Sequence, residues 1–97
     1  MEGDAVGTPA LAGLKVAEFA HVIAGPLAGT LLADLGAEVV HVEPPGGGDA
    51  ARLMGPERDG VYLWWKVAGR NKRSVSLDLR KPAGRAVAAP VARICEP

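Results

Sequence analysis

The short segment His21–Pro26, with the sequence HVIAGP, has the residue types of an anion-binding turn. Its side chains are mostly small, so a ligand could approach the main chain closely. Gly25 followed by Pro26 is typical of a helix start, and the first N–H groups of a helix have no acceptor within the helix. These amides and the positive end of the helix dipole attract phosphate and other anions. The sequence therefore predicts an anion-binding site at this turn.

Two strands and a helix are expected to position the turn. Leu14–Phe19 and Val39–Val42 are short apolar runs whose lengths suit buried parallel strands. Between them, Gly25 is the expected N-cap and Pro26 the first residue of a helix. Leucines recur at helical spacing up to Leu35–Gly36, where the glycine can end the helix in the left-handed conformation. Such a βαβ unit leaves the turn at the carboxyl end of the first strand, where open α/β sheets bind ligands.

The remainder of the chain is expected to extend this unit into an α/β fold with an open parallel sheet. Residues 44–49 are rich in proline and glycine and predict a loop. Residues 61–67 are apolar and aromatic and short enough to be a helical turn or a strand. A helix is favoured, because the chain must cross back over the sheet. Ser74–Leu79 alternates in polarity and predicts a half-buried third strand. Pro82 is expected to begin a last helix that Pro90 interrupts, because proline inside a helix costs about 3 kcal/mol.

Composition indicates one small folded domain. The chain has 97 residues, of which 48% are hydrophobic and 23% are charged. Residues 1–10 show no period and are expected to be a flexible lead-in, followed by a single unit at residues 11–97. The longest uncharged run, residues 19–33, is interrupted by glycine and proline and falls short of the ~20 apolar residues of a membrane span. The acidic N-terminus and single cysteine favour a cytoplasmic location.

The histidines and the cysteine predict little chemistry of their own. His21 follows the first strand, and hydrogen bonding that shapes the turn is favoured over a chemical role. A structural role is expected of His41, which alternates with valines in the second strand. Cys95 has no base placed beside it in the sequence. Two histidines and one cysteine at such spacings predict no metal site.

The two halves of the chain carry opposite charge. Residues 1–49 hold seven acidic residues and one basic residue, whereas residues 50–97 hold four acidic and ten basic residues. Most of the bases lie between Lys66 and Arg85, where Asp78 is the single acid. This basic segment could meet a polyanion or form a solvated surface, and both interpretations stay open. Nucleic acid is not an expected partner, because no recognised binding motif is present.

Two blocks of the sequence resemble a known family. HVIAGPLAGTLLADLGAEVVHVEPPGGGD at residues 21–49 and GRNKRSVSLDLRKPAGR at residues 69–85 look like the amino-terminal region of the family III CoA-transferases. The resemblance covers about residues 11–85. It implies a Rossmann-like open parallel βαβ sheet that is incomplete relative to the full family domain, since family members are several times longer. Residues 11–97 would form the amino-terminal part of the family's large domain, and full-length members form homodimers.

The resemblance implies that coenzyme A or acyl-CoA is bound as a substrate, with a carboxylic acid as acceptor and no permanently bound cofactor. Coenzyme A carries a pyrophosphate and a 3′-phosphate, so a basic segment beside a helix N-terminus suits it. Ile23 stands where formyl-CoA transferase has a glutamine, and Pro44 where it has an arginine, so substrate choice is not inherited. The implied CoA-binding residues are Val22, Ile23, Ala24, Gly25, Leu77 and Arg80.

The family's chemistry, as the resemblance implies, depends on an aspartate that attacks the acyl-CoA thioester. This aspartate lies downstream of the matched region, so no catalytic residue is expected here and the chain alone is not expected to be catalytically competent. Asp34 is interpreted as a helix-surface residue. Asp49 is interpreted as a loop residue or an N-cap, and Asp78 as a solvent-facing strand position.

Three alternatives stay open. The related α-methylacyl-CoA racemases resemble the same region and also use downstream residues. A dinucleotide-binding oxidoreductase fragment would place Glu43 near an adenine ribose, although the fingerprint G-x-G-x-x-G is absent. The third alternative is a non-catalytic remnant, because a three-stranded open sheet with unpaired edges buries little apolar surface by itself.

Overall fold

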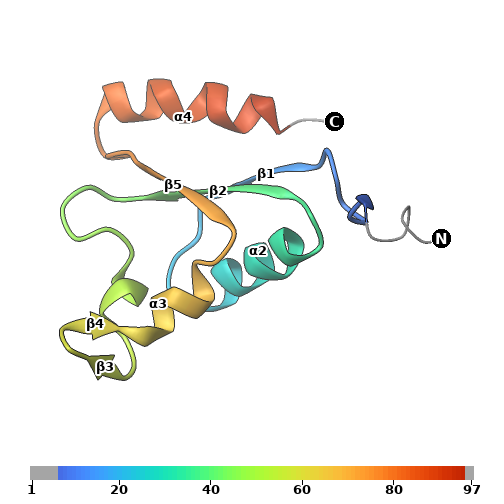
Figure 1. The fold of residues 1–97 in the computed structure, drawn as a ribbon. Coiled ribbons are helices and arrows are strands. Elements are labelled where there is room, and N and C mark those ends of the chain that lie inside the picture. The colour runs from blue at the N-terminus through green and yellow to red at the C-terminus, as the bar shows by residue number, and fades with distance from the viewer. Residues whose placement is uncertain (1–6, 96–97) are drawn as a thin grey trace.

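The computed structural model describes residues 7–95, which fold into a parallel sheet with helices on both faces (Figure 1). The predicted α/β class is confirmed. Within this part of the chain, no helix has the length and apolar character needed to cross a membrane. The elements are β1 (Lys15–Glu18), α2 (Ala24–Asp34), β2 (Glu38–Glu43), the 3₁₀ helix η1 (Ala50–Leu53), β3 (Glu57–Arg58), β4 (Val61–Tyr62), α3 (Leu63–Ala68), β5 (Lys72–Ser76) and α4 (Pro82–Ile94).

The three parallel strands lie in the order β1-β2-β5, so β2 is central. Helices α2 and α3 lie on one face of the sheet and α4 on the other (Figure 1). The apolar core is thin, because its buried cluster consists of the small side chains Ala33, Ala37 and Val39. Much of the remaining burial is polar. The buried polar and charged residues are Glu18, Thr30, His41, Glu43 and Asp49.

Helix α2 begins earlier than the sequence predicted. Its N-cap is Ile23 and not Gly25, so Pro26 is the third helical residue rather than the first. Proline is tolerated there because the first N–H groups of a helix have no intrahelical acceptor. Gly25 is required by close packing instead, since a Cβ at this position would lie 2.2 Å from Ala20 Cβ. The helix ends at Asp34, and Gly36 has the expected positive φ, +106°.

The third strand, β5, covers Lys72–Ser76 and not the predicted Ser74–Leu79. It pairs with β2 along its whole length. The pairing ends where β2 reaches Pro44, which has no N–H to offer a neighbouring strand. The strand begins at Lys72, whose ammonium group is neutralised inside the protein, 2.9 Å from Glu18 Oε1.

Helix α4 begins at Pro82, as predicted, but continues through Pro90 to Ile94. The predicted interruption is therefore wrong. Proline leaves the carbonyl group of the residue four positions earlier without its helical donor. That residue, Ala86, is exposed, so water can bind the carbonyl.

The segment between β2 and β5 contains the hairpin β3–β4, which the sequence did not predict, and α3, which confirms part of the helix expected at residues 61–67. Thr30 joins α3 to α2, because its Oγ1 lies 2.9 Å from the carbonyl oxygen of Pro26 and 2.5 Å from that of Ala68.

Of the predicted lead-in, residues 1–6 lie outside the described part of the chain.

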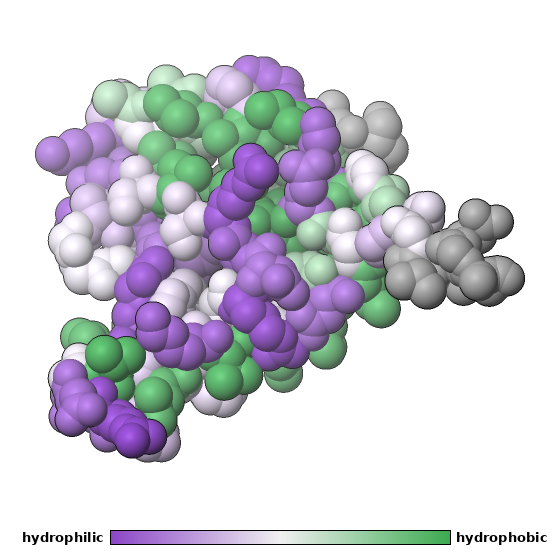
Figure 2. Space-filling model, viewed as in Figure 1, coloured by the Kyte–Doolittle hydropathy of each residue, from purple (hydrophilic) through white to green (hydrophobic). Residues whose placement is uncertain are grey.

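Large apolar side chains remain on the surface. Leu27 and Leu31 of α2, and Leu35 just after the helix, recur every four residues, and each is about half exposed. On the face shown in Figure 2, apolar residues also gather over α4, whereas hydrophilic residues cross the middle of the molecule. Residues 7–95 therefore include few large buried side chains, and polar contacts make up much of the interior.

Candidate functional site

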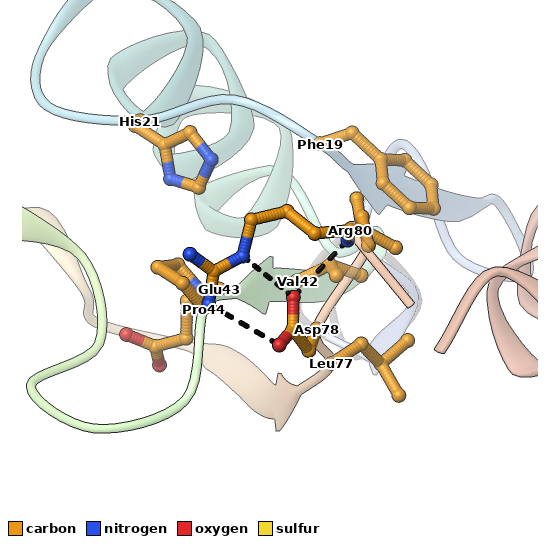
Figure 3. A pocket seen from close by; sticks show the side chains of 9 residues that line it. Phe19, His21, Val42, Glu43, Pro44, Leu77, Asp78 and Arg80 are labelled. Carbon is orange, nitrogen blue, oxygen red and sulfur yellow. Dashed lines mark hydrogen bonds and ion pairs between the residues drawn. The ribbon is translucent and has the colours of Figure 1, made fainter. Parts of the chain in front are cut away.

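A pocket of about 150 Å³ lies where the three parallel strands end (Figure 3). Phe19 and His21 form one wall, from the segment that follows β1. The opposite wall comes from the end of β2 and from the segment after β5, and it includes Leu77 and Arg80. Pro44 also lines the pocket. This edge of an open α/β sheet is where such folds bind ligands.

The turn between β1 and α2 borders this pocket. Of the residues predicted there, Gly25 lines a separate groove of about 270 Å³ between β1 and α2. Val22 is half-buried, whereas Ile23 and Ala24, at the start of the helix, are exposed. The structure therefore places the six predicted residues in two neighbouring groups, at the turn and at the pocket wall.

Val22 has an unusual backbone conformation, with φ of 72°. A β-branched residue in the left-handed region is a genuine outlier, because its side chain crowds the main chain. Strain of this kind costs about 1–3 kcal/mol and persists only where the surroundings enforce it. Val22 N–H donates a hydrogen bond of 3.1 Å to Asp49 Oδ1.

Asp49 makes several of the hydrogen bonds that hold this part of the structure together. Its Oδ1 also accepts a hydrogen bond of 3.0 Å from Ala51 N–H, which confirms the predicted N-cap of the segment that follows. Its own N–H donates to Glu43 Oε1 at 2.7 Å. The side chain is fully buried although it belongs to a loop. Sequence reasoning recognised the cap but missed the contact with Val22.

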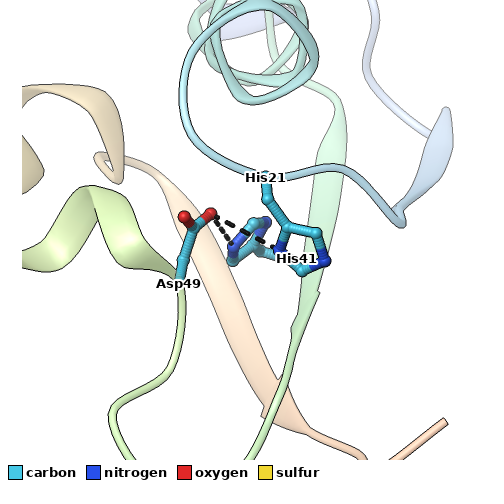
Figure 4. Close-up of side chains that lie close together, drawn as sticks. All are labelled: His21, His41 and Asp49. Carbon is cyan, nitrogen blue, oxygen red and sulfur yellow. Dashed lines mark ion pairs between the residues drawn. The ribbon is translucent and has the colours of Figure 1, made fainter. Parts of the chain in front are cut away.

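His41 lies between two carboxylates in the centre of the sheet. Figure 4 shows its contact with one of them, Asp49. Its Nδ1 contacts Glu18 Oε2, and its Nε2 lies 3.0 Å from Asp49 Oδ2. The second contact has the distance of an ion pair but not the angle of a hydrogen bond. His21 is exposed, with its Nδ1 at 3.9 Å from Asp49 Oδ2. The structural role expected of His41 thus has a physical basis, because the ring joins β1 to the loop after β2.

The structure also brings together possible ligands for a cation. His21, His41 and Asp49 place one ligand atom each within 4.8 Å of one another. Asp49 already accepts from backbone amides, and the other ring nitrogen of His41 contacts Glu18. We therefore interpret this cluster as a network of hydrogen bonds and ion pairs. The absence of a metal site stays a prediction.

Lys72 ties this network to the start of α2. Its Nζ lies 2.9 Å from Glu18 Oε1 and donates to the carbonyl oxygen of Pro26 at 2.6 Å. The side chain of Lys72 is 1% exposed and that of Glu18 is 4% exposed. The turn is therefore fixed at two points, by Asp49 at the N–H of Val22 and by Lys72 at the carbonyl group of Pro26.

Glu43 forms a two-pronged ion pair with Arg52. Arg52 Nε donates to Oε1 at 2.7 Å and Nη2 donates to Oε2 at 2.5 Å. Hydrogen bonding from Arg52 lowers the pKa of Glu43 to about 2, although burial acts in the opposite direction. The guanidinium group lies 4.5 Å from the centre of the Trp65 ring. Because both Glu43 oxygens are engaged, this carboxylate is not free to hold a ribose, which argues against the oxidoreductase alternative.

Asp78 and Arg80 form a second pair at the pocket. Arg80 Nε lies 3.0 Å from Asp78 Oδ1, and the N–H of Arg80 donates to the same oxygen at 3.1 Å. These hydrogen bonds from Arg80 lower the pKa of Asp78. The Asp78 side chain is 16% exposed and follows β5, so the prediction of a solvent-facing strand position is wrong. Arg80 is 87% exposed and offers a cation at the mouth of the pocket.

Comparison with known proteins gives consistent matches. The model of CoA-transferase family III matches residues 11–94. Succinyl-CoA–D-citramalate CoA-transferase of Chloroflexus aurantiacus is 52% identical over 75 residues, which cover 76% of this chain and 19% of the relative. Formyl-CoA:oxalate CoA-transferase of Rhodopseudomonas palustris is 41% identical over 92 residues, which cover 92% and 21%.

A solved structure agrees with these relatives. The crystal structure of a CaiB/BaiF family protein from Brucella suis has a TM-score of 0.76 and 39% sequence identity, and the match covers 86% of this chain and 23% of that one. The chain therefore spans about a fifth of the length of the curated relatives that it matches.

Proposed function

The chain belongs to CoA-transferase family III, and from this membership we propose that it supplies the CoA-binding portion of an enzyme that transfers CoA between an acyl-CoA and a carboxylic acid. The portion proposed is the amino-terminal part of the family's large domain, with a Rossmann-like sheet. The relatives described above are named as transferases, which favours transfer over racemase chemistry. The homodimer and the cytoplasmic location stay predictions.

One observation carries the proposal: an accessible helix start and an exposed cation lie on the two sides of the same sheet edge. Ile23 and Ala24 are exposed residues at the N-terminus of α2, where backbone amides and the helix dipole favour phosphate. Arg80 supplies a guanidinium group across the pocket. Leu77 and Phe19 give the pocket an apolar surface, and an adenine ring can pack against it.

The carboxylates at the pocket are poor candidates for the family's nucleophile. Glu43 and Asp78 are both held by arginine side chains, and both pKa values lie below the ordinary value. A carboxylate that is stabilised in this way is a weaker nucleophile. We propose that residues 7–95 bind CoA without performing the acyl transfer, and that the transfer needs residues outside this part of the chain.

Titration of the ¹⁵N-labelled chain with CoA, followed by NMR, tests the proposed function. We expect CoA to shift the amide signals of residues 22–25 and 77–80, and dephospho-CoA, which lacks the 3′-phosphate, to bind more weakly. NADH serves as the competing ligand for the oxidoreductase alternative. Shifts confined to other parts of the sheet, or tighter binding of NADH than of CoA, would contradict the proposal.

A pair of arginine variants refines the test. Arg80→Gln should weaken CoA binding about two- to fivefold, the scale of an exposed ion pair. Arg93→Gln, in the last turn of α4, removes an exposed charge away from the pocket and is the matched control. Equal affinities for both variants would show that Arg80 does not meet the ligand.

A further inference from the structure

The strained turn and the buried carboxylate behind it suggest how the CoA site is held in shape. We propose that Asp49 is a positioning residue for the CoA site: it holds Val22 in the left-handed conformation and thereby aims the start of α2 at the ligand. This inference rests on the proposed function. Asp49 itself is fully buried and so acts through the turn rather than by touching CoA.

The geometry shows why the turn needs an external support. Val22 N–H donates to Asp49 Oδ1 at 3.1 Å, across 27 residues of sequence. With φ of 72°, Val22 is strained, and without this acceptor its main chain would relax toward negative φ. Val22 immediately precedes Ile23, the N-cap of α2. A change of φ at Val22 therefore rotates the peptide units that carry the first amides of the helix.

Asp49 is itself fixed from several sides. Glu43 accepts its N–H at 2.7 Å, Ala51 donates to Oδ1 at 3.0 Å, and His41 Nε2 lies 3.0 Å from Oδ2. Through His41 the support continues to Glu18, which lies on β1. The carboxylate is thus held by η1 and β2, β2 also holds the main chain of Asp49, and its position relative to the turn is set by the sheet.

A glycine at position 22 separates positioning from simple stabilisation. Glycine populates positive φ about as readily as negative φ, so Val22→Gly should keep the turn without help. We expect Asp49→Ala to weaken CoA binding about tenfold or more, the scale of a lost hydrogen bond to a charged group. Adding Val22→Gly should restore the affinity to within about threefold of the value for Val22→Gly alone. A general loss of stability would not be repaired in this way.

The experiment uses the full 97-residue chain and two readouts. NMR backbone couplings and Cα and Cβ shifts of Val22 report its φ without any ligand, and titration with CoA reports affinity. Asp49→Ala should move Val22 out of the left-handed region. Asp59→Ala is the matched control, because Asp59 is exposed in the β3–β4 turn and also has a positive φ, 53°. If Asp49→Ala does not fold, Asp49→Asn serves in its place and should show smaller changes in the same direction.

The outcomes are distinct. Unchanged φ and unchanged affinity in the Asp49 variants would overturn the inference. Lost affinity that Val22→Gly does not restore would also overturn it, because Asp49 would then be only structural. If the unaltered chain binds no CoA, the proposed function fails, and the conformation of Val22 alone decides whether Asp49 holds the turn.

Discussion

The ion pair between Glu43 and Arg52 makes the stability of the chain depend on acid in a way that can be calculated. The pKa of Glu43 is about 2 in the folded chain, against an ordinary value of 4.5. One pKa unit corresponds to about 1.4 kcal/mol, so the ionised carboxylate stabilises the fold by on the order of 3 kcal/mol. Because the folded pKa lies below the unfolded one, this contribution is complete above pH 4.5 and is lost as the pH falls toward 2.

Glu43→Gln imitates the protonated carboxyl group at every pH. At pH 7 we expect this variant to lose on the order of 3 kcal/mol of unfolding free energy, because an amide cannot accept both donors of Arg52. Its stability should then change less than that of the unaltered chain between pH 4.5 and 2.5. Urea unfolding followed by tryptophan fluorescence measures both effects, since Arg52 lies 4.5 Å from the Trp65 ring.

The comparison between variants removes the contributions of the other acids. Glu57→Gln, on the exposed strand β3, is the matched control and should keep the full acid dependence. If Glu43→Gln is unfolded at pH 7, Arg52→Lys keeps the charge but loses the two-pronged geometry and should show a smaller loss. Equal pH dependence of the unaltered chain and Glu43→Gln would refute the assignment of this acid sensitivity to Glu43.

Three further sets of variants test the buried contacts and the last helix by urea unfolding. Gly29→Ala would place a Cβ 1.8 Å from Glu18 Oε1 and should cost about 2 kcal/mol or more, whereas Gly47→Ala, with no atom within 4 Å, should cost little. Lys72→Met leaves Glu18 buried without its cation and should cost roughly 3–5 kcal/mol. Adding Glu18→Gln should recover much of that loss, and a double variant no more stable than Lys72→Met would contradict this account. Pro90→Ala should stabilise the chain by up to about 3 kcal/mol. An unchanged midpoint with unchanged helical circular dichroism would argue that α4 does not continue through this position.

The parts of the fold that could be predicted are those specified by local signals. Gly36 ends a helix because glycine adopts positive φ, and Pro82 begins one because proline needs no hydrogen-bond acceptor there. Asp49 caps η1 through an amide two residues away. Each of these signals depends on neighbours in sequence, so the sequence alone contains the information.

The errors lie where residues far apart in the chain decide the structure. Gly25 suggested a cap, but contact with Ala20 accounts for the glycine and the helix begins at Ala24. The third strand begins at Lys72, whose ammonium group meets a carboxylate 54 residues away. The alternation of polar and apolar side chains cannot reveal such a pair, because a lysine in a strand is normally taken as a solvent-exposed position.

In the candidate site, too, some residues could be predicted from the sequence and others could not. Leu77 and Arg80 were predicted through the family resemblance and line the pocket, although their contact with CoA stays a prediction. Asp49 could have been suspected of a role in the site, because it is the acidic residue that follows the three glycines. Its contact with Val22, however, depends on the path of the whole loop. The support behind the turn was therefore beyond the reach of motif reasoning.

The opposite charges of the two halves now have a structural meaning. Glu18, Asp34 and Glu43 belong to the acidic half, and each pairs with a base of the other half. These pairs link the βαβ unit to the segment that returns to form β5, so part of the charge asymmetry is used inside the fold. The basic segment is therefore not a uniform polyanion surface. Arg80, paired with Asp78 and exposed at the pocket, is one base of that segment that an anionic ligand can meet.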